Sequence, residues 1–351
     1  MVETQNKLAV VILNWNGLKY LKEFIPILIK YSSIEGVGLY IADNGSKDES
    51  VNYLKQNHPE INLILLEKNY GFAEGYNKAL EKVDSEYFVL LNSDVEVTEG
   101  WIEPLIKLMD SDSEIAACMP KIMDYYMRDY FEYAGAAGGF IDKYAYPFCR
   151  GRIFDEIEKD NGQYNNFESI FWASGACLFI RKDIYFKAGG LDGNFFAHME
   201  EIDLCWRIKN MGHKIMFCPE SKVYHVGGGT LSKNNPKKTY LNFRNNLYLL
   251  YKNLPEGKVF SLIFFRMILD GIAGVKFLIG FEFSNFWAII KAHFSFYRNV
   301  SRFSEKRQKN IKTLFITYDY PEKKNFSIVY SFFVKKLRLY SKLYNAEKSD
   351  I

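Results

Sequence analysis

EYFVLLNSDVEV, residues 86–97, is the stretch of sequence that decides the fold. Its first half, Tyr87–Leu91, is apolar without alternation, which indicates a strand buried on both faces, as in a parallel sheet. Asn92, Asp94 and Glu96 follow, and a side-chain period of two places them on one side. Ligands bind at the carboxyl ends of such strands, and these oxygen donors suit a Mg²⁺ or Mn²⁺ ion that carries phosphates. A solvated turn capped by an asparagine is the alternative that this stretch alone leaves open.

The residues before this stretch alternate between strand and helix patterns. Apolar runs at 8–13, 38–42 and 61–66 predict strands, and stripes at 18–28, 46–57 and 72–83 predict helices, the second beginning with a capping box of Ser46 and Glu49. This alternation indicates βαβ units and a parallel sheet. Four strands then deliver similar polar residues to one edge, which favours a nucleotide site there. These residues are Asn14 and Asn16, Asp43 and Asn44, Asn69 and Gly71, and Asn92 and Asp94.

The residues after this stretch give weaker patterns. We expect a helix after Trp101, a loop system or small sheet over the aromatic-rich residues 124–171, and a buried strand over 171–180. A further helix is expected over 204–211, followed by paired strands at 214–218 and 222–226 around Pro219.

Charge divides the 351 residues into two regions. Residues 1–250 hold 27 Lys and Arg against 34 Asp and Glu, whereas residues 251–351 hold 18 against 8. This division predicts an acidic, metal-using body, residues 1–254, followed by a basic, aromatic-rich helical region, residues 255–351, with a different partner. No nucleic-acid partner is expected.

The cysteines and the N-terminus indicate the compartment. The five cysteines form no CxxC pair and no zinc spacing, so we expect reduced thiols used as small apolar side chains. The chain begins with a strand pattern and no signal-peptide pattern, which predicts a cytoplasmic protein, at the inner face of the membrane if residues 255–351 bind lipid.

The region 255–351 leaves two alternatives open. Its uncharged runs are shorter than the ~20 residues that a membrane-spanning helix needs. Basic residues beside aromatic ones favour peripheral contact with anionic headgroups. An ordinary helical subdomain with a solvated basic face, in contact with an acceptor or a second subunit, is the alternative.

Seven segments in order resemble one known family. They are VVILNWNG, IADNGSKD, EKNYGFAEGYNKAL, LLNSDVEV, SGACLFIRKD, GGLDGNFFAHMEEIDLCWR and VYHVGGGT. The chain is similar to inverting family 2 glycosyltransferases of the GT-A fold, in the rhamnosyltransferase-like branch of bacterial polysaccharide biosynthesis. The resemblance implies a Rossmann-like, mixed and mainly parallel sheet flanked by helices, with a C-terminal helical appendage. It also implies transfer of a hexosyl or rhamnosyl group from a UDP- or dTDP-sugar to a hydroxyl of a glycan or lipid-linked acceptor.

The resemblance assigns roles to residues. Asp43 would accept the N3–H of the pyrimidine base, and Asp94 and His225 would hold Mn²⁺ or Mg²⁺, with the His favouring Mn²⁺. Two positions depart from the family pattern, because Asn92 replaces the first acid of its DxD motif and Glu201 replaces an Asp as general base. Glu200 and Asp203 are the alternative bases. The implied nucleotide-binding residues are Asn14, Asn16, Asp43, Asn69, Gly71, Asn77, Asn92, Ser93 and Asp94, and the implied sugar and acceptor pocket contains Trp172, Phe196 and His198.

Two other classes of protein remain as alternatives. A sugar nucleotidyltransferase would need a basic, glycine-rich loop near the N-terminus, whereas this chain has Asn-Trp-Asn-Gly before Lys19. A non-catalytic, membrane-associated module that binds sugar nucleotides would explain the basic C-terminal region.

Overall fold

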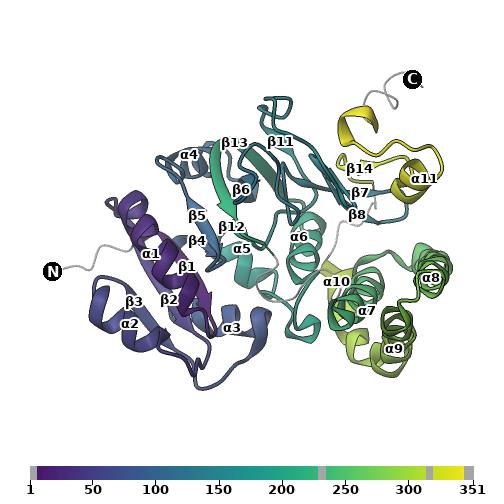
Figure 1. The fold of residues 1–351 in the computed structure, drawn as a ribbon, viewed down its shortest axis with the longest axis horizontal. Helices are drawn as coiled ribbons and strands as arrows, with labels where there is room; N and C mark the ends of the chain where they lie inside the picture. Colours follow the sequence, from purple (N-terminus) through teal and green to yellow (C-terminus); the bar gives the residue numbers. More distant parts are fainter. Residues whose placement is uncertain (1–5, 228–234, 314–318, 344–351) are drawn as a thin grey trace.

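The first half of the main sheet is parallel, as the βαβ pattern predicts. The structure is a computed structural model that describes residues 6–227, 235–313 and 319–343. The parallel strands lie in the order β3-β2-β1-β4, and α1, α2 and α3 connect them (Figure 1). The strands are β1 (Asn6–Asn14), β2 (Val37–Asp43), β3 (Asn62–Leu65) and β4 (Ser85–Leu91), and the helices are α1 (Leu18–Ser32), α2 (Ser50–Asn57) and α3 (Gly71–Leu80).

The second half of the sheet is mixed. Strand β12 runs antiparallel to both β4 and β6, and β13 continues the sheet parallel to β6. Short strands β5 and β11 pair antiparallel with β13. The strands are β5 (Val95–Val97), β6 (Ile115–Asp124), β11 (Glu168–Ser169), β12 (Cys177–Arg181) and β13 (Lys214–His225). The helices are α4 (Glu103–Ser111), α5 (Lys182–Lys187), the 3₁₀ helix η1 (Gly193–Phe195) and α6 (Glu200–Asn210).

Three local expectations are wrong. The strand expected from residue 171 begins only at Cys177, because Ser174 holds a turn in which its Oγ accepts the N–H of Ala176 at 3.2 Å. The two strands expected around Pro219 are one strand, β13, whose register shifts between Cys218 and Lys222. Helix α2 has no side-chain cap and begins at Ser50, since the hydroxyl of Ser46 is bonded elsewhere.

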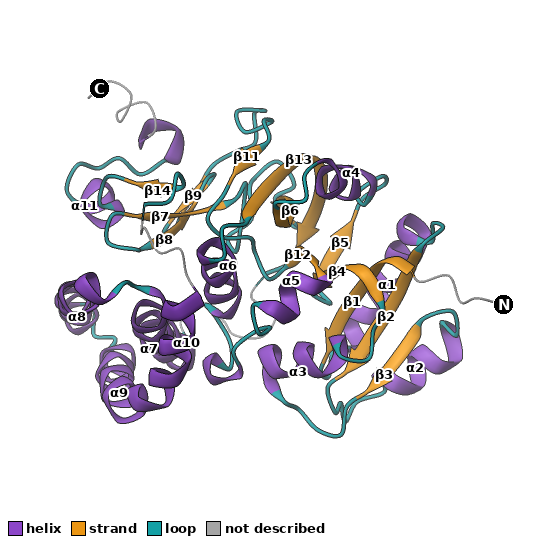
Figure 2. Cartoon of the chain, turned by 180° about the vertical axis from the view of Figure 1, so that it is seen from behind, coloured by secondary structure: helices purple, strands orange, loops and turns teal. Residues whose placement is uncertain are grey.

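A second, five-stranded sheet occupies part of the aromatic-rich stretch, as expected for a small sheet. Its order is β10-β9-β8-β7-β14, and its last strand comes from the C-terminal region (Figure 2). Behind it, Glu322 forms a buried ion pair with Lys209 of α6 at 2.7 Å. The strands are β7 (Gly139–Asp142), β8 (Pro147–Cys149), β9 (Arg152–Ile153), β10 (Glu156–Ile157) and β14 (Lys323–Lys324).

Of the remaining helices, α7 to α10 lie together at one end of the molecule, while α11 lies beside β14 of the second sheet (Figure 1). Among the described residues, no helix combines the length and the apolar character needed to cross a membrane. Helix α7, before residue 254, packs against α8 and α9, and β14, after it, pairs with β7 of the second sheet. Because the two regions share these contacts, the division at residue 254 stays a prediction. The helices are α7 (Pro236–Asn253), α8 (Glu256–Ile279), α9 (Phe283–Asn299), the 3₁₀ helix η2 (Val300–Phe303), α10 (Ser304–Thr313) and α11 (Ile328–Phe333).

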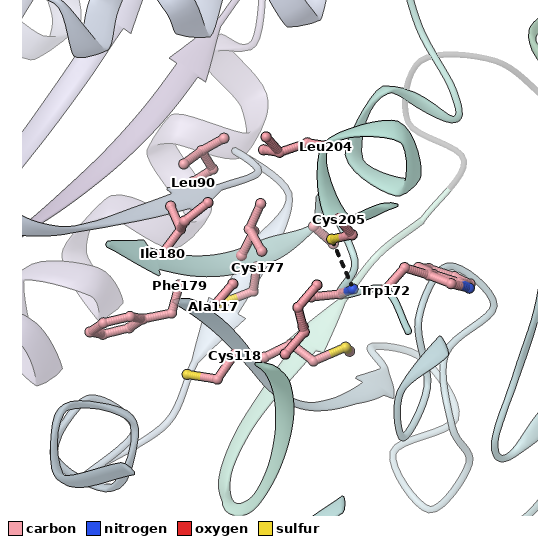
Figure 3. Close-up of a cluster of buried hydrophobic side chains, with 14 of the residues drawn as sticks. Leu90, Ala117, Cys118, Trp172, Cys177, Phe179, Ile180, Leu204 and Cys205 are labelled. Carbon is pink, nitrogen blue, oxygen red and sulfur yellow. Dashed lines mark hydrogen bonds between the residues drawn. The ribbon is translucent and has the colours of Figure 1, made fainter. Parts of the chain in front are cut away.

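The core lies on both faces of the main sheet, and cysteines serve in it as small apolar side chains. Cys118, Cys177 and Cys205 are fully buried among Leu90, Phe179 and their neighbours (Figure 3). All five cysteines are free thiols, as expected, and burial raises the pKa of the Cys177 thiol. Such thiols are unreactive packing groups.

Candidate active site

The ends of β1 and β2 place two predicted residues side by side. Asn14 and Asp43 are partners in the strand register, and the amide of Asn14 donates to Asp43 Oδ2 at 3.1 Å and to Ser46 Oγ at 3.2 Å. The other oxygen of Asp43 accepts the N–H of Ser46 at 2.9 Å. Asp43 is buried, yet a carboxylate has lone pairs for a further donor. Its position therefore suits recognition of a single N–H group of a base.

Asn16 stabilises the loop beside this pair. Its backbone lies in the left-handed region at φ 51°, its N–H donates to Ser46 Oγ, and its side-chain oxygen accepts the N–H of Lys47. The hydroxyl that was expected to cap α2 thus joins the first and second strand ends. Asn16 serves this loop through both its backbone and its side chain.

Asn44 organises the third strand end, a function that the sequence did not indicate beyond its place in a polar tip. Its amide donates to Asn69 Oδ1 at 3.2 Å and to the carbonyl of Gly71 at 3.0 Å, and its oxygen accepts the N–H of Tyr70. Gly71 has φ +80°, a conformation that favours glycine, and α3 begins there. Together these bonds fix the turn that leads into α3.

Asn77, predicted to bind nucleotide, uses its side chain within the protein. Its amide donates to the carbonyl of Leu191 at 2.7 Å, and its oxygen accepts from Tyr185 Oη at 2.6 Å and from Leu191 N at 3.0 Å. These bonds attach α3 to the loop that precedes η1. The structure therefore gives Asn77 a positioning role.

Asp94 and His225 lie in contact at the edge of the sheet. β13 ends at His225, whose register partner is Val95 of β5, and Asp94 Oδ1 lies 3.2 Å from His225 Nε2. On the far side of the ring, Nδ1 lies 3.3 Å from Glu132 Oε1. Glu132 stands in the irregular stretch and belongs to none of the seven segments, so no sequence pattern singled it out.

Burial and charge act against each other at this pair. Burial lowers the pKa of His225, but the charges of Glu132 and Asp94 outweigh it and raise the pKa to about 10. Burial raises the pKa of Asp94, while the hydrogen bond and charge of His225 bring it below its usual value. The imidazole is thus protonated, and a metal ion bound there would replace its proton.

The donors of this pair fit a divalent cation bound together with a diphosphate. Within the described ranges, no three His, Cys, Asp or Glu side chains are grouped to hold a metal by themselves. Asp94 and His225 would supply one oxygen and one nitrogen, and Mg²⁺ and Mn²⁺ sites commonly leave other positions to phosphates and water. Glu132 would orient the ring from behind, as carboxylates do for metal-bound histidines. Glu96 is not a metal ligand in this arrangement, because both its oxygens accept hydrogen bonds from Arg128.

The first turn of α6 carries the expected carboxylates. Burial raises the pKa of Glu201 to about 7. Burial and the charge of Glu201 raise the pKa of Glu200 well above its usual value, and Glu200 Oε2 has no hydrogen-bond partner among the described residues. A carboxyl group that titrates near neutrality suits a general base.

Asp203, the other alternative base, is occupied by structural contacts. It is fully buried, and its oxygens accept from Arg207, Lys252 and Asn253 at 2.8–3.0 Å. Despite burial, the charges of Lys252 and Arg207 hold its pKa below the usual value. Asp203 therefore attaches α6 to α7, and among the described residues both its oxygens are engaged in these structural bonds.

Glycine 175 lets α6 approach the sheet. A Cβ there would lie 3.6 Å from Phe72 and 3.7 Å from the Cβ of Glu201. The next residue, Ala176, accepts the N–H of Asn92 at 3.0 Å. Glu201 therefore lies beside Gly175, and the residue after Gly175 bonds Asn92, two positions before Asp94.

Gly17 lies close to the residues that follow or end β1 and β4. A Cβ at Gly17 would lie 2.3 Å from Asn14 Oδ1 and 3.7 Å from Ser93 Oγ. Ser93 is the neighbour of Asp94 in the chain. The ends of β2, β1 and β4 are adjacent in the sheet, so the Asn14–Asp43 pair and the Asp94–His225 pair follow neighbouring strand ends, and Glu201 packs at Gly175.

The segment before α6 has an uncommon backbone. Phe196, His198 and Met199 all have positive φ, at 68°, 70° and 74°. Asn245 of α7 stabilises it, because its amide donates to the carbonyls of Phe195, Ala197 and His198 at 3.0, 2.8 and 2.7 Å. Such strain persists only where the surroundings enforce it, and it is common at functional sites.

The three residues expected to line the sugar and acceptor pocket differ in position. Trp172 is 4% exposed, packs against Gly139 and donates to the carbonyl of Phe140, so it lies in the core (Figure 3). Phe196 is 49% exposed and lies beside Gly71 at the third strand end. Burial, followed by the charge of Lys238, lowers the pKa of His198 to about 4, which makes it a neutral side chain at pH 7. Phe196 thus lies at the third strand end and His198 in the segment before α6, whereas Trp172 is a core residue.

Comparison with known proteins identifies the family. A model of the family described as Glycosyl transferase family 2 matches residues 9–186, just over half of the chain. The chain belongs to this family. The glycosyltransferase is 23% identical over 235 residues to N-acetylglucosaminyl-diphospho-decaprenol L-rhamnosyltransferase of Mycobacterium tuberculosis, a match that covers 62% of this chain and 75% of that protein. It is 22% identical over 163 residues to rhamnosyltransferase WbbL of Escherichia coli, covering 44% of this chain and 61% of that protein.

Solved structures establish the same fold. The glycosyltransferase superposes on GalNAc-T7 with UDP, GalNAc and Mn²⁺ at a TM-score of 0.56 and 16% identity, covering 71% of this chain and 48% of that chain. It superposes on mannosyltransferase PcManGT from Pyrobaculum calidifontis, in complex with GDP-Man and Mn²⁺, at 0.50 and 13% identity, covering 89% and 80%. The expected GT-A fold, the family and its rhamnosyltransferase-like branch are confirmed.

Proposed function

We propose that this family 2 glycosyltransferase moves a sugar from a UDP- or dTDP-sugar to a hydroxyl of a glycan or lipid-linked acceptor, with inversion at the anomeric carbon. The observation that carries the proposal is that the Asn14–Asp43 and Asp94–His225 pairs follow neighbouring strand ends of the sheet, with Glu201 packed at Gly175. The relatives named as rhamnosyltransferases support hexosyl or rhamnosyl transfer in the synthesis of cell-surface polysaccharide. The name of the mycobacterial relative contains a polyprenyl diphosphate, which supports a reaction at the cytoplasmic face of a membrane.

In the proposed reaction, Asp43 accepts the imide N–H of the base, and Asn14 and Asn44 keep the strand ends in place. The ionised carboxylate of Glu201 takes the proton of the acceptor hydroxyl as its oxygen attacks the anomeric carbon, and the bond to the nucleoside diphosphate breaks. Asp94 and His225 would hold the Mn²⁺ or Mg²⁺, which when bound offsets the charge that develops on the diphosphate.

Glu200 contributes to the base through electrostatics. Burial and the charge of Glu201 raise the pKa of Glu200 well above its usual value, which disfavours a second charge beside Glu201. Because the adjacent carboxyls interact, protonation of one favours ionisation of the other. Glu201 is the better base of the two, since Glu200 is the more buried.

The test is release of nucleotide from UDP- and dTDP-sugars, with and without Mn²⁺, by the wild type and by Asp94→Ala. We expect release that depends on Mn²⁺ and is lost in the variant while the circular-dichroism spectrum stays that of the wild type. Equal turnover by Asp94→Ala in a metal chelator would exclude the metal-assisted reaction. No release from any sugar nucleotide would favour the non-catalytic binding module.

A further inference from the structure

Two charged side chains in the middle of helix α8 point inward. Arg266 and Asp270 are buried and joined by a hydrogen bond of 3.1 Å, and Asp270 Oδ2 lies 3.0 Å from Nε2 of His293 on α9. The guanidinium of Arg266 also lies 4.2 Å from the ring centre of Tyr146, at the second sheet. These polar contacts fix the rotation of α8 about its axis.

The outward face of α8 is consequently apolar. Its exposed apolar residues recur every three or four positions, so they form one stripe about 28 Å long. They are Phe260, Phe264, Ile268, Ile272, Val275 and Ile279. Helix α9 adds Phe283, Trp287, Phe294 and Tyr297, and we call both sets together the α8–α9 surface. Soluble proteins rarely expose so long an apolar patch unless it binds something.

Charges around the α8–α9 surface indicate its partner. Between residues 256 and 303, five exposed side chains are basic and only two, Glu256 and Glu282, are acidic. A second copy of the chain would bring this positive surface against itself, which opposes dimer formation. Anionic lipid headgroups complement it, and Trp and Tyr favour the same interfacial depth. The basic residues are Lys258, Lys276, Lys291, Arg298 and Arg302.

We propose that the α8–α9 surface docks the enzyme on an anionic lipid bilayer, with the two helices lying in the headgroup region. Both lie at the edge of the molecule beside α7 (Figures 1 and 2). Because α7 packs against both helices and its Asn245 bonds the segment before Glu201, contacts connect the docked helices to the base. Resting on the proposed function, this connection would keep the site at the depth where a lipid-linked hydroxyl is presented.

The experiment measures binding of the full chain to vesicles by co-sedimentation. Vesicles of phosphatidylcholine mixed with phosphatidylglycerol, whose headgroup is anionic, are compared with pure phosphatidylcholine. The variant Phe264→Gln/Ile272→Gln/Ile279→Gln removes part of the stripe and keeps helix-forming residues. The matched control, Leu65→Gln/Phe167→Gln/Phe186→Gln, makes the same kind of change at exposed apolar residues elsewhere.

We expect the wild type and the control to bind the anionic vesicles, and to bind pure phosphatidylcholine less. Losing partial burial of one apolar side chain costs about five-fold in partitioning, so the α8 variant should bind about a hundred-fold less. Wild type that fails to sediment, or an α8 variant that binds like the control, overturns the proposal. A wild-type dimer in sedimentation velocity that the α8 variant dissociates also overturns it, since the surface would then bind a second copy.

Nucleotide release without vesicles separates this inference from the proposed function. The α8 variant should release nucleotide at the wild-type rate, because its changes are remote from the site. Vesicle binding by a wild type that releases no nucleotide would support docking and contradict the transfer reaction.

Discussion

Replacing Asn245 with Ala should lower kcat, because Asn245 positions the segment that carries the base. Its amide donates to three carbonyls of the segment that leads into α6. Three non-glycine residues there have positive φ, each costing about 1 kcal/mol or more. Without the amide, the segment can relax to ordinary backbone conformations and carry Glu200 and Glu201 away from Gly175.

The magnitude follows from the hydrogen bonds that are lost. Each is worth about 1 kcal/mol net, so the observed conformation loses about 2–3 kcal/mol relative to relaxed ones. Since 1.4 kcal/mol is a factor of ten, we expect kcat to fall about 30- to 100-fold. Asn245→Asp should be at least as impaired, because an isosteric carboxylate cannot donate and would repel the carbonyls.

The assay is the initial rate of nucleotide release at saturating donor, with thermal unfolding followed by circular dichroism. The control is Asn246→Ala, which truncates the next buried residue of α7, whose side-chain oxygen has no hydrogen-bond partner among the described residues. We expect its kcat to stay within about three-fold of wild type. If Asn245→Ala is folded and also stays within about three-fold, α7 does not position the base.

Three further predictions concern the base, the metal pair and the buried ion cluster. Because Glu201 acts when ionised and its pKa is raised to about 7, kcat should rise with pH through neutrality. Glu201→Gln should abolish this rise and lower kcat at least about 100-fold, with little change in donor affinity. An unchanged pH profile in the variant would assign the base elsewhere. His225→Gln should weaken Mn²⁺ binding in isothermal titration calorimetry by about ten-fold or more, and unaltered affinity would exclude the imidazole as a ligand. Lys252→Met should destabilise the fold by about 2–3 kcal/mol in urea unfolding, because Asp192 and Asp203 lose their shared buried cation and keep only Lys306 and Arg207. A loss under about 1 kcal/mol would contradict that account.

The sequence by itself determined the elements in which side-chain periodicity is local. Unbroken apolar runs fixed β1, β2 and β4, and parallel strands end at one edge, so Asn14, Asp43 and Asp94 could be placed near each other in advance. The resemblance of seven ordered segments fixed the family. The apolar pattern failed to place the start of β12, because such a pattern is equally compatible with a strand and a buried loop. A turn made by Ser174 decides between them.

Only the tertiary structure decided which distant groups each of these side chains meets. Glu201 and Asp203 stand two residues apart in one acidic turn, yet only Asp203 meets the cations of Arg207 and Lys252. Asn245 reaches carbonyls 47 to 50 residues away. Glu132 and His225 likewise meet from distant parts of the chain. Periodicity records which face of an element is buried, but not which distant side chain will be packed against it, and that neighbour sets the charge state and the role of each carboxylate.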